Sequence, residues 1–202
     1  EVTGVKVTRK IKIIIGIAIA VLILGGVTIF GVTQYQKKKA AKEYAESVKT
    51  YSDNLELATV TMLKGAGDAE DCGNLIKNVW YNAIYKEKDD ETDKYTRPDG
   101  YFVSDFNDAL GNLFVDSSFS SKIDSIDKNQ DTVNSLMKKL KNPPEEYKDA
   151  YDALSDFYDA YLALTGCATD PSGSLQTYSS TFNDADTDTL NAYKAMQQYL
   201  GD

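Results

Sequence analysis

The 202-residue sequence contains no histidine and only two cysteines. Without histidine, the chain cannot build a Ser-His-Asp triad, an imidazole general base or a histidine-ligated zinc site. Two cysteines are too few for a structural zinc site. The glycine-rich Walker and GxGxxG motifs and the GxSxG motif of hydrolases are missing too. We therefore expect a protein that is not an enzyme and that needs neither metal nor cofactor.

The acidic motifs of this chain do not match a calcium-binding loop either. The run Asp184-x-Asp186-x-Asp188 begins like an EF-hand loop, which needs glycine at its sixth position and a bidentate glutamate at its twelfth. Thr189 and Ala195 occupy these two positions. Specific calcium binding is not expected.

One long apolar run lies near the start of the sequence. Residues 13–32 read IIIGIAIAVLILGGVTIFGV, in which Thr28 is the only polar side chain. At about 1.5 Å per residue this run forms about 30 Å of helix, the thickness of a bilayer core. It is longer than the apolar part of a secretory signal and is not followed by a small-x-small cleavage site. We predict an uncleaved transmembrane helix over 13–36, between a basic tail over 1–12 and a helical extracytoplasmic domain over 37–202.

Charge is distributed unevenly along the chain. Residues 1–42 carry eight basic side chains and one acidic side chain, a net charge of +7. Because the whole chain has a net charge of −9, the remaining 160 residues have a net charge of −16. An acidic domain of this kind is repelled by nucleic acid and by anionic lipid. Four basic residues on each side of the apolar run make the positive-inside rule almost uninformative, but long domains cross membranes regardless of charge. We expect a single-pass protein of the cell membrane with its large domain outside.

After the apolar run, apolar residues recur at steps of three and four. One stripe from Tyr44 to Ala83 predicts a helix of about 40 residues, bent near Gly65 and Gly67. The charged segment 87–100 predicts a loop. Further stripes and caps predict helices over 102–113, 119–140, 143–168 and 175–200, with the segment DSSFSS capping the second of these and Asn142 the third. The predicted fold is all-α: one transmembrane helix that continues into an up-down-up-down helical bundle.

The helix predicted over 143–168 carries two sets of candidate interaction residues. Its tyrosines form a stripe beside the Ala/Phe face, and its aspartates form a ridge opposite that face. The tyrosines either pack at the boundary of the core or form an aromatic platform for an envelope glycan or a partner protein. The aspartates are either a solvated face or a docking surface for a basic partner. The candidates are Tyr147, Tyr151, Tyr158, Tyr161, Asp149, Asp152, Asp156 and Asp159.

The two cysteines lie on predicted inward stripes of two rising helices. Cys72 is 28 residues above Tyr44, and Cys167 is 24 residues above Pro143. At about 1.5 Å per residue these heights are similar, so the pair is a candidate disulfide, with two buried free thiols as the alternative. Within the apolar run, the pair Gly16-xxx-Ala20 is a weak signal for homo-association through the transmembrane helix.

Several stretches resemble an uncharacterised group of Gram-positive bacterial single-pass membrane proteins with a helical extracytoplasmic domain. They are NVWYNAIY (78–85), DFNDALGNLF (105–114), SLMKKLKNPPEEYKDAYDAL (135–154) and GSLQTYSSTFNDAD (173–186). The resemblance covers most of residues 45–200, and KNPPEEYKDAY is its most specific part. Members often carry an N-terminal zinc ribbon, which would lie before Glu1 here. The resemblance implies no activity, and no functional residue is carried over from it.

Two function classes remain open. One is a membrane-anchored ectodomain that acts as a binding or sensing module at the cell envelope. The other is a structural or accessory envelope protein that acts through membrane anchoring and self-association. A pocket with convergent polar groups between helices favours the first class, and a solid core with an apolar outer patch favours the second.

Overall fold

The computed structural model describes the backbone of residues 9–200 and the side chains of residues 33–200, and the chain in this range is helical without strands. Two compact units are present, Glu1–Thr50 and Tyr51–Asp202. In the part of the chain that the structure describes, no helix is long and apolar enough to span a membrane. Most of the predicted span over 13–36, with its Gly16 and Ala20 pair, lies outside the described side chains, which begin at residue 33.

In the first unit the described chain belongs to helix α1 (Arg9–Tyr85). Its side chains from residue 33 to residue 47 are exposed to solvent. Ion pairs one helical turn apart lie on this surface, between Lys39 and Glu43 at 3.8 Å and between Lys42 and Glu46 at 3.7 Å. Each such pair stabilises a solvated helix by about 0.3–0.5 kcal/mol.

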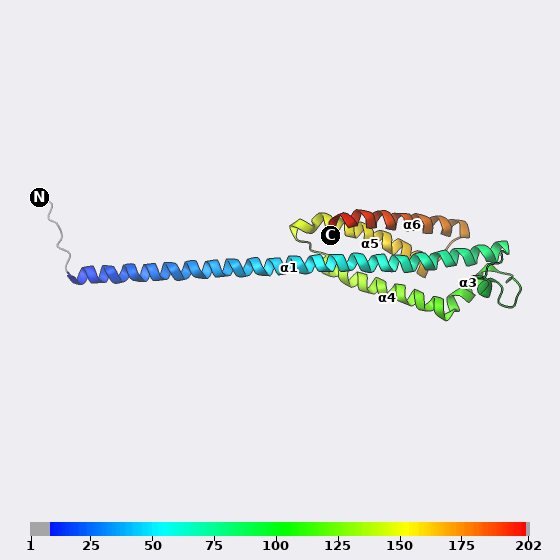
Figure 1. The fold of residues 1–202 in the computed structure, drawn as a ribbon, viewed down its shortest axis with the longest axis horizontal. Coiled ribbons are helices and arrows are strands. Elements are labelled where there is room, and N and C mark those ends of the chain that lie inside the picture. The colour runs from blue at the N-terminus through cyan, green and yellow to red at the C-terminus, as the bar shows by residue number, and fades with distance from the viewer. Residues whose placement is uncertain (1–8, 201–202) are drawn as a thin grey trace. The chain divides into compact units, whose positions relative to one another are not determined.

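The second unit is a four-helix bundle with three short helical segments, α2, η1 and η2. From Tyr51 on, α1 runs in one direction, α3 and α4 return antiparallel to it, α5 runs parallel to α1, and α6 returns (Figure 1). For this unit the predicted all-α, up-down-up-down bundle is confirmed. Its elements after α1 are α2 (Asp93–Thr96), α3 (Phe106–Val115), α4 (Ser117–Leu140), η1 (Glu145–Tyr147), α5 (Lys148–Thr169), α6 (Leu175–Met196) and η2 (Gln197–Tyr199).

Two helix starts were predicted from capping residues, and one of them is right. The carboxylate of Asp116, the first residue of DSSFSS, accepts hydrogen bonds from the backbone N–H groups of Ser118 and Phe119 and caps α4. Asn142 does not cap α5. Pro144 has φ −53° and ψ 156°, an extended polyproline conformation, so the chain enters a 3₁₀ turn first and α5 begins only at Lys148.

The predicted loop over 87–100 contains the short helix α2, which the sequence pattern does not indicate. The Asp89 carboxylate accepts from the backbone N–H groups of Glu91 and Thr92, which fixes a turn. The Asn82 amide of α1 then donates to the buried Thr92 hydroxyl at 2.9 Å. This tertiary hydrogen bond holds the segment against the end of α1.

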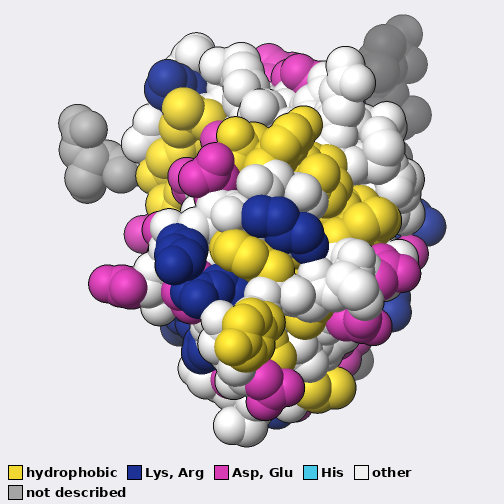
Figure 2. All heavy atoms as spheres, turned by 90° about the vertical axis from the view of Figure 1, so that its right-hand side faces the viewer, with side chains coloured by type: hydrophobic (Ala, Val, Ile, Leu, Met, Phe, Trp, Pro, Cys, Tyr) yellow, Lys and Arg dark blue, Asp and Glu magenta, His cyan; other side chains and the backbone are white. Residues whose placement is uncertain are grey.

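An apolar surface lies at the end of the bundle where α1 stops. Its exposed side chains come from the last turns of α1, from the loop that follows α2 and from the end of α3. We call this set the end surface: Tyr81, Ile84, Tyr85, Tyr101 and Val115. Figure 2 shows this end of the molecule, where hydrophobic side chains gather with Lys and Arg side chains among them. The rings of Tyr81 and Tyr85 lie 4.5 Å apart.

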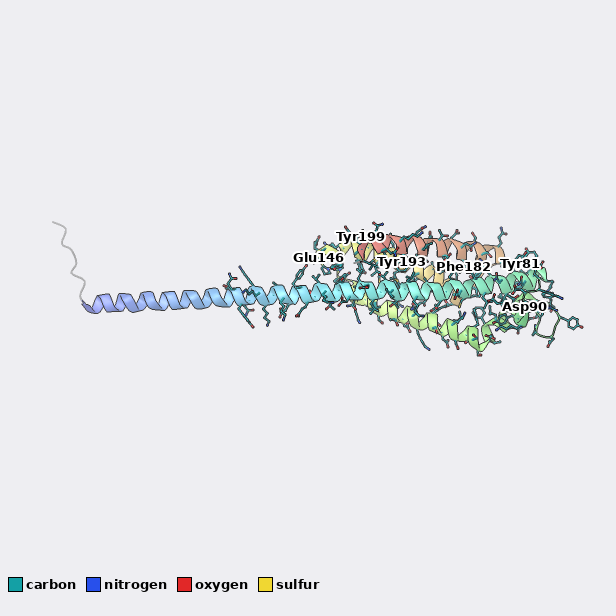
Figure 3. The ribbon with its side chains drawn as sticks, in the orientation of Figure 1. Tyr81, Asp90, Glu146, Phe182, Tyr193 and Tyr199 are labelled. Atoms are coloured by element: carbon teal, nitrogen blue, oxygen red, sulfur yellow. The ribbon has the colours of Figure 1, made fainter. Side chains whose placement is uncertain are left out.

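Two glycines of α1 let other helices approach its backbone closely. A Cβ atom at Gly65 would lie 2.1 Å from Oδ1 of Asn129 on α4, and one at Gly73 would lie 2.1 Å from the ring of Phe182 on α6 (Figure 3). α1 remains α-helical through Gly65 and Gly67. Trp80 of α1 is buried, and its ring stacks on that of Phe106 with 5.6 Å between the ring centroids.

The buried face of α5 differs from the predicted one. The Ala/Phe stripe placed Ala153, Ala160 and Cys167 inward, but these three are only half-buried. Leu154, Tyr161 and Ala168 are buried instead. The helix is rotated so that Leu154 and Tyr161 enter the core, where they bury more apolar area than Ala153 and Ala160 would.

Candidate functional site

Tyr161 belongs to the core and not to a surface. Its side chain is 0% exposed, and its hydroxyl donates a hydrogen bond to Oδ1 of Asn129 at 2.7 Å. Burial, with a smaller contribution from Tyr158, raises the pKa of Tyr161 well above its ordinary value. Of the two alternatives for these tyrosines, Tyr161 fits core packing and not an aromatic platform, because the partner amide on α4 lets the ring turn inward.

Tyr147 is half-buried at the end of the bundle near Tyr51. The two rings lie 5.2 Å apart, and the Tyr51 hydroxyl donates to the backbone oxygen of Leu140 at 3.0 Å. These contacts tie α1, α4 and the start of α5 together. Tyr147 thus has a packing role in the structure.

Tyr151 and Tyr158 line an open groove between α4 and α5, with a volume of about 560 Å³. This volume lies in the range of small-ligand sites, which is roughly 300–1,000 Å³. One wall comes from the last turns of α4 and the other from α5. We call it the tyrosine groove, and its lining is Asn134, Met137, Lys138, Lys141, Tyr151, Ser155, Tyr158 and Asp159.

The polar groups of the tyrosine groove are arranged around the two rings. The Tyr158 hydroxyl donates to Oδ1 of Asn134 across the groove, which fixes the orientation of its ring. Burial, and secondarily the Asp159 carboxylate, raises the pKa of Tyr158. Lys138 and Lys141 add positive charge on the α4 side. Aromatic faces, an amide and two ammonium groups are suited to stack a ring and hold an anionic substituent.

The four predicted aspartates Asp149, Asp152, Asp156 and Asp159 are all exposed on α5. Only Asp159 lines the tyrosine groove. The other three form a solvated ridge, and the structure gives them no additional contact that would distinguish a docking surface. The sequence did not predict the lysine side of the groove. Lys138 lies on α4 and Lys141 directly follows it, and the residue pattern of one helix does not indicate which other helix packs beside it.

Both cysteines are free thiols in the structure, Cys72 buried at 1% exposure and Cys167 half-buried. Burial raises the pKa of Cys72 to about 11, and it also raises that of Cys167. The Tyr178 hydroxyl lies 3.4 Å from the backbone oxygen of Gly73 and 3.2 Å from that of Cys167. The two cysteine segments thus converge on one tyrosine, and the candidate bond between them is not formed in this structure.

The acidic run Asp184 to Asp188 lies within the continuous helix α6, so it cannot wrap a cation as an EF-hand loop does. Across residues 33–200, no three Cys, Asp or Glu side chains come together in a way that could hold a metal ion.

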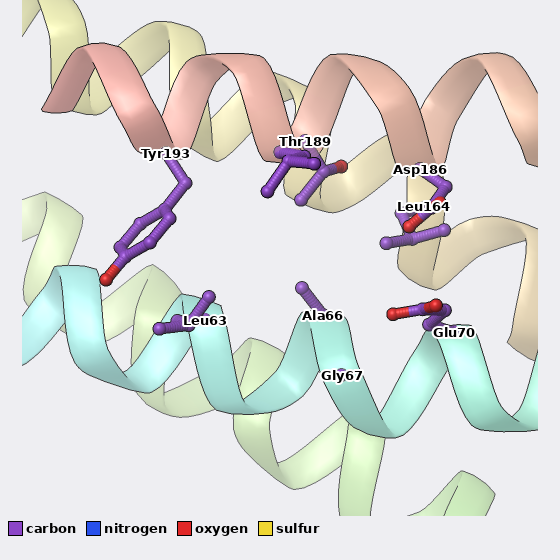
Figure 4. Close-up of a pocket in the computed structure, with 9 residues that line it drawn as sticks. Leu63, Ala66, Gly67, Glu70, Leu164, Asp186, Thr189 and Tyr193 are labelled. Carbon is purple, nitrogen blue, oxygen red and sulfur yellow. The ribbon is translucent and has the colours of Figure 1, made fainter. Parts of the chain in front are cut away.

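A second groove, between α1 and α6 and with α5 below, was not predicted. It encloses about 110 Å³ and has an apolar floor with two carboxylates at one end (Figure 4). We call it the acidic groove, and its lining is Leu63, Ala66, Gly67, Glu70, Leu164, Asp186, Thr189, Leu190 and Tyr193. Leu63, an apolar residue that lies off the main stripe of α1, is the sequence signal that marks it.

Comparison with protein-family models, with curated proteins and with solved structures gives no match for this chain. The resemblance to single-pass membrane proteins of Gram-positive bacteria stays a prediction. Function is therefore argued from the geometry and chemistry of the grooves and surfaces.

Proposed function

We propose that this chain is a membrane-anchored helical ectodomain that acts as a binding module at the cell envelope, with the tyrosine groove as its ligand site. The observation that carries this proposal is the convergence of Tyr151, Tyr158, Lys138 and Lys141 on one groove of about 560 Å³. Such a groove with convergent polar groups is the feature expected of a binding module.

The ligand class that fits the tyrosine groove best is an anionic glycan. Tyrosine rings pack against the apolar faces of sugar rings, while hydroxyl and amide groups such as Ser155 and Asn134 can exchange hydrogen bonds with sugar hydroxyls. Lys138 and Lys141 complement a carboxylate or phosphate substituent, whereas most of the domain surface is acidic and repels it.

The anchor in this proposal is the apolar run over 13–32, with the acidic domain outside the cytoplasm. Protease added to intact cells should digest residues 43–202, because a basic tail precedes the run and one large domain follows it. Survival of the domain in intact cells, with digestion only after lysis, contradicts this topology.

The ligand site is tested by titrating the domain with oligosaccharides that bear carboxylate or phosphate groups, alongside matched neutral oligosaccharides. Tyr151→Ala should weaken binding of the charged oligosaccharide about tenfold, a loss of about 1.4 kcal/mol. Tyr101→Ala, an exposed tyrosine far along the sequence from the groove, is the matched control and should leave affinity unchanged. Equal effects of the two variants, or equal binding of charged and neutral oligosaccharides, argue against the site as proposed.

The alternative function is a structural or accessory envelope protein that acts through self-association. The apolar end surface favours it, since exposed patches of this kind mark contact sites. Sedimentation equilibrium of the wild-type domain and of Tyr85→Ser tests it. A dimer that Tyr85→Ser abolishes supports the alternative, and a monomer at all concentrations removes it.

A further inference from the structure

The exposed face of α1 beside α6 carries apolar side chains that the packing of this chain does not use. Leu63 on α1 is 40% exposed and Leu190 on α6 is 52% exposed, and both line the acidic groove. Figure 4 shows Leu63 and Ala66 on α1 facing α6, with Tyr193 at one end and Glu70 with Asp186 at the other. An apolar strip with a charged end has the pattern that receives an amphipathic helix.

Gly67 is the second observation. Gly65 and Gly73 are explained by side chains of this chain that occupy the space of a Cβ atom, but a Cβ atom at Gly67 would meet nothing within 4 Å. A glycine inside a helix is destabilising relative to alanine. Because nothing within the bundle approaches Gly67, which lines the acidic groove, the helix backbone there is open to a close approach from outside.

The charged end of the acidic groove is the third observation. Glu70 and Asp186 have no lysine or arginine within 4 Å among the residues the structure describes, and the nearby Lys64 is paired with Asp68 at 2.7 Å. Burial, and then the negative charges of Asp186 and Asp71, raise the pKa of Glu70. A cation placed between them would relieve this repulsion.

We propose that the acidic groove docks an amphipathic helix of a partner protein, whose apolar face lies along Leu63 and Leu190 and whose lysine or arginine reaches Glu70 and Asp186. A second copy of this chain fits less well. A self-association would bring together two domains that each carry a net charge of −16 over residues 43–202 and would offer the carboxylates an equally acidic partner. The proposal is independent of the tyrosine groove, which lies between α4 and α5.

The test uses residues 43–202, because every buried hydrophobic side chain among the described residues lies between Tyr51 and Met196. The probe is a synthetic peptide of about 18 residues with leucines at helical spacing and lysines on one flank, in about 150 mM salt to screen non-specific attraction. A matched peptide carries glutamate in place of lysine. Fluorescence anisotropy of labelled peptides should show that the lysine peptide binds the domain and that the glutamate peptide does not.

Two charge variants locate that binding. Glu70→Gln with Asp186→Asn should weaken binding of the lysine peptide about tenfold, whereas Asp152→Asn with Asp156→Asn, which removes the same charge from the exposed ridge of α5, should change it less than about twofold. Equal weakening by both pairs means that only net charge attracts the peptide and overturns the proposal. Failure of the lysine peptide to bind overturns it as well, as does a wild-type dimer that Leu63→Asp disrupts.

Gly67→Ala separates docking from folding. It should raise the melting temperature of the free domain by about 2–4 °C, because alanine favours a helix more than glycine does. It should nevertheless weaken binding of the lysine peptide several-fold, because the added methyl group blocks the close approach. Gly111→Ala, at another helical glycine with open space around it, should raise the melting temperature without changing affinity. If Gly67→Ala binds the lysine peptide as tightly as the wild type does, the peptide helix does not approach the α1 backbone at Gly67. None of these results depends on whether the tyrosine groove binds a glycan.

Discussion

Asn129 is the side chain that decides how α1, α4 and α5 meet. Its amide donates to the backbone oxygen of Thr61 at 3.0 Å and accepts from the Tyr161 hydroxyl at 2.7 Å. Gly65 leaves the space that this amide occupies. Asn129 is half-buried, and a polar side chain that is hydrogen-bonded to two neighbouring helices fixes how those helices align.

Gly65→Ala should therefore lower the free energy of unfolding by about 1–3 kcal/mol, because the new methyl group collides with the Asn129 amide. Gly111→Ala is the control, and it should raise the free energy of unfolding by up to about 1 kcal/mol. Urea denaturation of both variants measures the difference. A Gly65→Ala domain as stable as Gly111→Ala would show that Asn129 can move aside.

The buried tyrosines should make the domain sensitive to high pH. Burial raises the pKa of Tyr51 to about 12 and those of Tyr161 and Tyr178 further above the ordinary value of 10.0. Since folding favours the neutral form, this stabilisation is complete below pH 10 and is lost as the pH rises toward 12 and above. Ultraviolet titration should show exposed tyrosines ionising first and these three only with unfolding. A single transition near pH 10 for all tyrosines is the contrary result.

The cysteines should behave as protected free thiols. Thiolate is the reactive form, and a Cys72 pKa of about 11 leaves little thiolate at pH 8. Ellman titration should detect two thiols per chain after unfolding without reductant and a slow reaction of Cys72 before unfolding. No titratable thiol in the unfolded, unreduced chain would instead establish the bond predicted from the sequence.

At the scale of single elements, the cap of α4 is open to test. The backbone hydrogen bond from Phe119, ahead of the contacts with Lys94, holds the pKa of Asp116 below its ordinary 3.8, although partial desolvation opposes this. Asp116→Ala should lower the melting temperature by about 2–4 °C at neutral pH. The difference from wild type should vanish as the pH falls below that ordinary value, because the capping form is the carboxylate. Asp124→Ala, an exposed position within α4, controls for loss of charge.

A helix was predictable where the residues of that segment alone indicate it, as the apolar stripe does for α1 and the capping residue Asp116 does for the start of α4. What the sequence could not predict depends on a partner segment. The rotation of α5 needs Asn129 on α4, and α2 needs the hydrogen bond from Asn82 on α1. The same holds for the residues of the tyrosine groove. Tyr151, Tyr158 and Asp159 were predictable from the pattern of a single helix, whereas Lys138 and Lys141 could be assigned to the groove only from the position of α4 beside α5.

At the scale of the whole molecule, residues 43–202 should fold without metal or cofactor. The buried hydrophobic side chains of this segment come from α1 to α6 and form one cluster. Circular dichroism should therefore show a helix-dominated spectrum that EDTA leaves unchanged. A sheet-rich spectrum, or melting on addition of the chelator, contradicts this expectation.

The start of the core at Tyr51 has a consequence for how the chain can be cut. Side chains over 33–47 are exposed, and the buried cluster begins only at Tyr51. Among residues 33–200, endoproteolysis within 33–47 would remove no buried side chain, so the C-terminal fragment would keep its grooves and its fold. Limited trypsin digestion should cleave first after Lys37, Lys38, Lys39 or Lys42 and leave a resistant fragment. If the apolar run anchors the chain as proposed above, a single cut would release a diffusible domain.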